Sequence, residues 1–225
     1  MNKKRMVASV GVAVLIVVLA IGAFWFQATS QEGKKSYAAI IEKNFEEMNA
    51  TYSTETLLSS NPYDYTKNKH FKNIVDLGMD AVEILQEKGK SDEFSSLNSY
   101  VAAIAIQEIT GVDLYAITGV DYETADEFYS LWDKTLNNLP ETMSEIVQDK
   151  TSTLDEKVKN LENYGVFGEA FLNEIESSPK DKVNFHGEKI TYRLMSDEEN
   201  KVKKAIRNDK NVLDKANDYL DKYAK

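Results

Sequence analysis

The sequence predicts a mainly α-helical protein that one N-terminal transmembrane helix holds to a membrane. Residues 7–26 form an uncharged apolar segment, and along most of the remaining chain apolar side chains recur about every 3.6 positions. A third observation is the stretch 183–192, where apolar and polar side chains alternate on both sides of a glycine-containing turn. We therefore expect an N-terminal transmembrane helix followed by an extracytoplasmic helical domain with one short β-hairpin.

The apolar segment over residues 7–26 has the length of a membrane-spanning helix. As an α-helix it would be about 30 Å long, which matches the hydrocarbon core of a bilayer. Ser9 is its one clearly polar side chain, and Trp25 lies at its outer end, where aromatic rings favour the headgroup level. We expect this signal-anchor to contact the lipid bilayer as the single pass of a cell-membrane protein.

Charges beside the apolar segment predict its orientation. Lys3, Lys4 and Arg5 lie in the preceding tail, residues 1–6, and a basic cluster of this kind stays on the cytoplasmic side. The bulk of the chain is then extracytoplasmic. An alternative is a cleaved signal peptide, because small residues lead up to Ser30 and would allow secretion after cleavage near it. The apolar run exceeds the roughly 7–15 residues usual in a signal peptide, which favours the anchor.

The chain that follows the apolar segment is acidic. All 37 Asp and Glu residues follow it, but three of the 27 Lys and Arg residues precede it, which leaves 24 basic side chains and a net charge of −13. Such a field disfavours nucleic acid and favours cationic partners, although an ordinary solvated surface explains the same charge. The sequence contains no cysteine, which excludes a disulfide framework, thiol catalysis and a lipid-modified cysteine anchor.

Residues 27–35 form a short polar stem, and residues 36–225 form the predicted extracytoplasmic helical domain. A candidate subdomain break lies near residues 177–182, where two serines and a proline stop a helix. The first helix of the domain carries a stripe of apolar side chains at helical spacing: Ile40, Ile41, Phe45, Met48 and Tyr52.

The turn after this helix holds the candidate ligand or interaction residues. Asn61 before Pro62 predicts an N-cap with proline at the first helical position. Tyr63 and Tyr65 flank Asp64, so two aromatic rings and a carboxylate would line a ligand site. An aromatic turn packed on the core explains the same three residues.

An alanine-rich helix over residues 97–110 is predicted to lie at the centre of the domain. Small side chains let neighbouring helices approach closely, so we expect Val101 and Ile104 to be buried there. Gly78, which is able to adopt positive φ, ends one preceding helix, and another follows over residues 80–88.

Two segments in this region carry a family resemblance, LGMDAVEIL at 77–85 and VAAIAIQEITG at 101–111. With them, residues 71–111 resemble a HEAT-type helical repeat, which implies a helix hairpin of the kind that stacks into protein-binding surfaces. The proline usual at the start of the first helix is absent, and no clear array of repeats follows. The resemblance implies no catalytic residue.

Cap signals predict the helices of the second half. Residues 112–122 are expected to connect the alanine-rich helix to a helix that Thr124 and Glu127 open as a capping box. Pro140 starts the next helix, and Ser152 predicts a cap for another. A phenylalanine-rich helix follows before the candidate subdomain break.

The C-terminal part combines the hairpin with amphipathic helix. The hairpin at 183–192 is expected to pack on a helix, because an isolated hairpin is marginally stable in water. Ser196 and Glu199 form a second capping box, and apolar residues follow at three- and four-residue spacing from Val202 to Tyr223, with Asp209 interrupting the series. We expect this stretch to pack on its own domain, and a dimeric coiled coil is the alternative.

Motifs for catalysis or metal binding are missing from the sequence, which has no phosphate-binding glycine loop, HExxH motif, nucleophile elbow or EF-hand loop. We therefore predict no cofactor, no catalytic residue and no metal site. His70 and His186 are expected at surface or boundary positions. Helix-start carboxylates, which interact with the helix dipole, explain the densest acidic group more simply than a cation site does. This group comprises Asp121, Glu123, Asp126 and Glu127.

These observations predict a membrane-anchored module that binds another protein or an envelope component. One alternative is an extracytoplasmic hydrolase, because an acid–base pair needs only two carboxyl groups brought together by the fold. Another is a solute-sensing domain built around the turn at Tyr63, Asp64 and Tyr65. A pocket with converging ionisable side chains would favour the hydrolase, and an exposed apolar patch would favour the binding module.

Overall fold

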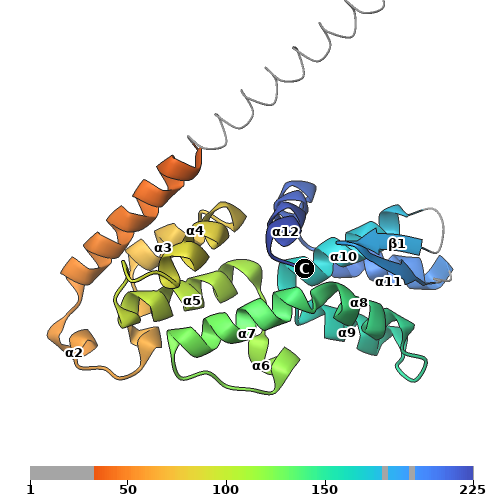
Figure 1. The fold of residues 1–225 in the computed structure, drawn as a ribbon, viewed down its shortest axis with the longest axis horizontal. Coiled ribbons are helices and arrows are strands. Elements are labelled where there is room, and N and C mark those ends of the chain that lie inside the picture. Colours follow the sequence, from red (N-terminus) through yellow and green to blue (C-terminus); the bar gives the residue numbers. More distant parts are fainter. Residues whose placement is uncertain (1–32, 179–181, 193–195, 225) are drawn as a thin grey trace, which may run out of the picture.

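The computed structural model describes residues 33–178, 182–192 and 196–224 and confirms a mainly helical fold with one short antiparallel hairpin (Figure 1). Residues 33–51 are helical. The strands are β1 (Lys182–Phe185) and β2 (Glu188–Thr191). The other helices are α2 (Thr54–Leu57), the 3-10 helix η1 (Pro62–Thr66), α3 (Lys69–Val75), α4 (Met79–Gly89), α5 (Ser96–Thr110), α6 (Leu114–Thr118), α7 (Ala125–Asn137), α8 (Leu139–Gln148), α9 (Leu154–Glu162), α10 (Gly165–Ser177), α11 (Ser196–Ala205) and α12 (Lys210–Tyr223).

The predicted membrane segment, residues 7–26, lies outside the described residues. Within the ranges that the structure describes, no helix is both long and apolar enough to cross a bilayer. Residues 33–35, predicted as the end of the stem, already belong to the helix over residues 33–51. That helix buries Ile41, Phe45 and Met48 against the domain, whereas Ile40, also expected in its apolar stripe, is 38% exposed.

Helix α5 lies at the centre of the domain, where η1, α3, α4, α7 and α10 all contact it. Val101 is fully buried and Ile104 is 6% exposed, which confirms the predicted core positions. Ala102, Ala103 and Ala105 are also fully buried, and their small side chains allow the close packing of α4 along α5. The two segments that resemble a HEAT-type repeat therefore do form a packed helix pair.

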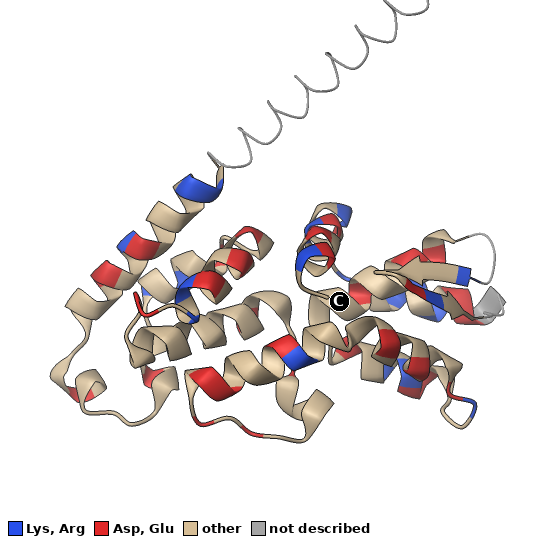
Figure 2. Ribbon diagram, in the orientation of Figure 1, with Lys and Arg blue, Asp and Glu red and all other residues tan. Residues whose placement is uncertain are grey.

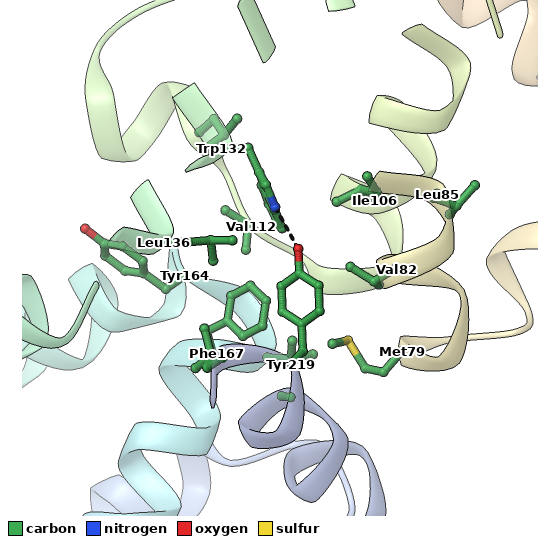
Figure 3. Close-up of a cluster of buried hydrophobic side chains, with 14 of the residues drawn as sticks. Met79, Val82, Leu85, Ile106, Val112, Trp132, Leu136, Tyr164, Phe167 and Tyr219 are labelled. Carbon is green, nitrogen blue, oxygen red and sulfur yellow. Dashed lines mark hydrogen bonds between the residues drawn. The ribbon is translucent and has the colours of Figure 1, made fainter. Parts of the chain in front are cut away.

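A buried polar network joins α4, α7 and α12 inside the core, and Figure 3 shows its bond between Trp132 and Tyr219. The indole Nε1 of Trp132 donates to the Tyr219 hydroxyl at 3.0 Å and to Gln86 Oε1 at 3.3 Å. The Tyr219 hydroxyl also donates to Gln86 Oε1. Phe167 of α10 stacks on the Tyr219 ring with centroids 5.7 Å apart. Four helices that are distant in sequence thus meet around one satisfied set of polar atoms.

Side-chain caps begin several helices where the sequence predicts them. The Asn61 side chain accepts from the backbone N–H of Tyr63 at the start of η1, and Thr124 caps α7 in a complete capping box. For α9 the predicted cap is wrong by one residue. Thr153 caps this helix, while the Ser152 hydroxyl donates to Asp149 instead. A string of hydroxyl and carboxyl residues offers several caps, and the backbone path selects one of them.

The segment 112–122, predicted as a connection, contains the short helix α6. Asp113 is its N-cap and accepts from the backbone N–H of Ala116 at 2.9 Å, and Gly119 ends it with φ +68°. Five residues are too few to show a helical apolar period, so the sequence pattern does not reveal this helix.

The start of α10 crosses the end of α5 at a glycine contact. Gly165 has φ +52°, and a Cβ atom there would lie 2.0 Å from the carbonyl oxygen of Thr110. An isolated antiparallel bridge between Val112 and Tyr164 runs beside this crossing. Glycine is required at position 165 for both its backbone conformation and this close approach.

The predicted hairpin forms and packs on a helix. His186 and Gly187 have φ values of +46° and +92°, as a two-residue turn of a β-hairpin requires. The Phe185 ring packs edge-on against Phe171 of α10, with centroids 4.9 Å apart.

The apolar stretch after Ser196 forms two helices, α11 and α12. Asp209, predicted as an interruption, is the N-cap of α12 and accepts from the backbone N–H of Val212 at 3.1 Å. Leu213 and Leu220 are buried, and α12 contacts α4, α7 and α10. This stretch packs on its own domain, as predicted.

Candidate functional site

The candidate residues Tyr63, Asp64 and Tyr65 lie in η1, where their side chains have three different environments. Tyr65 is buried and its hydroxyl donates to the Ser59 carbonyl at 3.0 Å. Asp64 accepts from Ser59 Oγ at 2.6 Å and from Lys67 Nζ at 2.7 Å. Tyr63 is 51% exposed. The structure does not gather the three into one ligand site, and Tyr65 belongs to the core.

Asp64 lies in an open depression of about 490 Å³, which Leu58 also lines. The hydrogen bond from Lys67, with a second from the Ser59 hydroxyl, lowers the pKa of the Asp64 carboxyl below its usual range. A carboxyl group held ionised in this way is poorly suited to act as a general acid at neutral pH.

A cluster of tyrosines joins the segment 119–124 to α5. The Tyr122 hydroxyl donates to Gln107 Oε1 in α5. The Tyr100 hydroxyl donates to the Tyr122 carbonyl at 3.2 Å, and burial raises the pKa of Tyr122. The half-exposed Tyr63 lies near enough to this cluster to raise the pKa of Tyr122 further.

Large apolar side chains remain exposed beside this cluster. Their exposed fractions run from 48% for Val120 to 82% for Leu58. In Figure 1 their elements, α2 and α6 with the adjoining loops, lie along the border remote from the start of the helix over residues 33–51. Large apolar side chains that stay exposed along one border are typical of an interaction site when a partner covers them. We call these residues the apolar edge: Leu57, Leu58, Tyr63, Tyr115 and Val120.

The acidic group predicted at the start of α7 lies next to this edge (Figure 2). Glu127 accepts the backbone N–H groups of Glu123 and Thr124, at 2.8 and 3.2 Å, as helix capping requires. Over the residues that the structure describes, no set of three or more ligand side chains is placed to hold a metal ion. The caps account for Glu127, and the neighbouring carboxylates of Asp121, Glu123 and Asp126 are exposed to solvent.

A separate cleft of about 520 Å³ opens between the start of the helix over residues 33–51, α4 and α12. Lys215 Nζ lies 2.6 Å from Asp80, and Glu83 lies 3.2 Å from Lys34 and 3.1 Å from Lys222. Partial burial opposes ionisation of Glu83, but the hydrogen bonds from the two lysines lower its pKa overall. These ion pairs join the start of the helix over residues 33–51 and α12 to α4.

The two histidines have structural contacts. His70 in α3 is buried, deeper than the predicted surface or boundary position, with Nδ1 at 3.1 Å from the Glu47 carboxylate. His186 lies 2.9 Å from Asp221 through Nδ1 and 3.2 Å from Asn217 through Nε2. Both ring nitrogens of His186 are engaged, so its role is to fasten the hairpin turn to α12.

The sequence pattern does not predict that Leu57, Leu58 and Tyr115 are exposed. They lie in α2, in its C-cap and in α6, which are helices of four and five residues. Apolar side chains in segments too short to show an inward face are the signal that points to the apolar edge.

Comparison with known proteins gives no match to a protein-family model, a curated protein or a solved structure. The resemblance to a HEAT-type repeat therefore rests on the pair α4 and α5 alone.

Proposed function

We propose that the chain is a membrane-anchored, extracytoplasmic helical module that binds another protein or an envelope component through the apolar edge. The observation that carries this proposal is the exposure of large apolar side chains, above all Leu58 and Tyr115, along one border of the domain. Covering such side chains with a partner removes apolar surface from water, at about 25 cal/mol per Å².

The proposed anchor determines where the apolar edge lies relative to the membrane. If residues 7–26 span the bilayer, Gly33 is the described residue nearest to it along the chain. The helix over residues 33–51 is about 28 Å long and leads from Gly33 to α2, which carries Leu57. The edge is then at the far end of this helix, where a partner outside the cell membrane can reach it.

The rival hypotheses have less support from the geometry. Glu83 in the cleft and Asp64 in the depression at η1 have lowered pKa values, so neither of these two carboxyl groups suits the role of the general acid in a carboxylate-based hydrolase. A solute site at Tyr63, Asp64 and Tyr65 needs side chains that converge, and Tyr65 is buried in the core. Binding through an exposed surface requires neither a general acid nor converging side chains.

Affinity capture of the full chain from solubilised membranes tests the proposal. We expect Leu58→Glu combined with Tyr115→Glu to lose the captured partner, because two charges would replace exposed apolar contacts. Both side chains are largely exposed, so the fold and its circular dichroism melt should change little.

The matched control adds two carboxylates at exposed positions elsewhere, Thr191→Glu and Asn211→Glu. This variant should capture the same partner as the unmodified chain. Equal capture by all three proteins would contradict binding through the apolar edge. Hydrolysis of an envelope polymer by the purified chain, lost in a Glu83→Gln variant, would favour the hydrolase instead.

A further inference from the structure

The carboxylates beside the apolar edge have no cationic partners. Asp121, Glu123 and Asp126 are exposed, and within the part of the chain that the structure describes none of them forms an ion pair. Figure 2 shows them on the loop before α7 and on its first turn. Some other carboxylates do meet lysines, as Asp80 meets Lys215 across the cleft.

The acidic and apolar side chains belong to one surface. Val120 of the apolar edge is followed directly by Asp121 and Tyr122, and the Tyr122 ring packs against Tyr100 with centroids 5.6 Å apart. The pKa of the neighbouring Tyr100 is raised mainly by burial and further by the surrounding side chains, Asp121 among them. The carboxylates are therefore close enough for their charge to act on the tyrosines that support the edge.

We infer that the apolar edge binds a basic segment of a partner protein, in which Lys or Arg alternates with apolar residues. This inference rests on the proposed function and adds the chemistry of the partner. Apolar side chains of the segment cover Tyr63, Tyr115 and Val120, while its cations meet Asp121 and Glu123. Such a partner supplies the charges that this surface lacks and that complementary interfaces require.

Other occupants conflict with the same charges. The whole chain carries a formal net charge of −10, so a second copy of it would be repelled. Nucleic acid and an anionic lipid surface present phosphates to these carboxylates, which is unfavourable for the same reason. A basic protein segment alone matches both the apolar side chains and the charge.

A fluorescein-labelled peptide that alternates Lys with Leu is the probe for this surface. The full chain is held in phosphatidylcholine nanodiscs, and binding is followed by fluorescence anisotropy. We expect saturable binding that weakens as salt is added, because the charges are exposed and screened. Peptides with Glu in place of Lys, or with Ser in place of Leu, should bind at least about tenfold more weakly.

The decisive variant removes the edge charges by Asp121→Asn, Glu123→Gln and Asp126→Asn. It leaves Glu127 in place to cap α7. We expect it to bind the Lys–Leu peptide about tenfold more weakly, because opposite charges no longer meet at the edge. The apolar variant Tyr115→Ser with Val120→Ser should weaken binding to a similar degree.

The matched control removes the same number of charges from another acidic depression, by Glu141→Gln, Glu145→Gln and Glu188→Gln. Its affinity should stay within about twofold of the unmodified chain, since the depression lies outside the apolar edge. Equal weakening by both charge variants, or binding that does not need Leu in the peptide, would overturn the inference.

Partner capture separates this inference from the proposed function. Loss of the captured partner in the Leu58 and Tyr115 variant, with full capture by the variant at Asp121, Glu123 and Asp126, would keep the function and overturn the basic partner. Loss of the captured partner in both variants would support the proposed function and the basic partner. Full capture by both variants would overturn the function and the inference together.

Discussion

Burial at single positions of α5 determines how the domain tolerates a new charge. Ile104 is 6% exposed and lies in the helix that five other elements contact. Asp126, in contrast, is exposed on the first turn of α7. The two positions therefore differ in the cost of moving a carboxylate from water into the protein.

Ile104→Asp should abolish or strongly weaken cooperative unfolding of the chain. A carboxylate among apolar neighbours costs several kcal/mol, which is comparable with the roughly 5–15 kcal/mol that stabilise a domain. Asp126→Asn with Glu127→Gln is the control, and it should cost about 1 kcal/mol through the weakened cap. Circular dichroism melts compare the variants, and a mild effect of Ile104→Asp would contradict its place in the core.

Features of single residues, such as helix caps, can be predicted from the sequence where they depend only on neighbouring residues. Thr124 caps α7 because its hydroxyl reaches an N–H of the same turn, and no distant contact is needed. The choice of Thr153 over Ser152 depends on the path of the loop before α9. Tyr63 and Tyr65 look alike in sequence, yet one is half exposed and the other buried, because η1 turns them to different sides.

The C-terminal helix α12 packs on a core formed by helices that precede it in the sequence. Tyr219 is 5% exposed and brings its hydroxyl to Trp132 of α7 and Gln86 of α4. The Tyr219 ring stacks on Phe167 of α10. The same side chain therefore makes apolar contacts through its ring and hydrogen bonds through its hydroxyl. Loss of the hydroxyl would leave buried polar atoms with fewer partners.

Tyr219→Phe should lower the free energy of unfolding by about 1–3 kcal/mol, the usual cost of an unsatisfied buried polar group. Tyr223→Phe is the matched control, because the Tyr223 side chain is partly exposed and its hydroxyl donates to Glu83 at 3.3 Å. Urea unfolding of both variants gives the comparison. Equal destabilisation by the two substitutions would mean that the buried network contributes little to the docking of α12.

Prediction at the scale of elements succeeds for long helices and fails for short ones. The buried positions Ile41, Phe45 and Met48 repeat over several turns of the helix over residues 33–51, and the alternation of β1 and β2 needs only two residues per period. The five residues of α6 are too few to show a helical period, and the apolar spacing after Ser196 runs through the break that Asp209 caps. The apolar edge lies largely in such short elements, so no apolar periodicity in the sequence could predict that its residues are exposed.

Ion pairs between distant parts of the chain act at the scale of the whole molecule. Lys215 and Asp80 are 135 positions apart and meet at 2.6 Å, and Lys222 meets Glu83 at 3.1 Å across a similar separation. Lys34 also meets Glu83, so the start of the helix over residues 33–51 and α12 share one carboxylate of α4. No spacing rule connects such partners, because only the packed fold brings them together.

The lowered carboxyl pKa values predict that the folded chain loses stability in acid. Hydrogen bonds from the Ser152 hydroxyl, then from Thr151, lower the pKa of Asp149 from 3.8 to about 2, and the backbone of Thr153 lowers that of Glu156. Because these groups bind protons more weakly when folded, their contribution is present above the unfolded pKa. It is lost as pH falls through the folded pKa.

The free energy of unfolding should therefore fall steadily as pH drops below about 5 toward 2, as more of these carboxylates must take up protons. Urea unfolding of the full chain at a series of pH values measures this slope. Asp149→Asn should flatten the slope between about pH 4 and 2, where the folded and unfolded Asp149 differ in proton binding. Asp92→Asn, at an exposed position between α4 and α5, is the control and should keep the slope. An unchanged slope in Asp149→Asn would show that the Ser152 and Thr151 hydrogen bonds do not favour the ionised carboxylate. A carboxyl group whose pKa differs between the folded and unfolded chain takes up protons on unfolding, so its removal must change the slope.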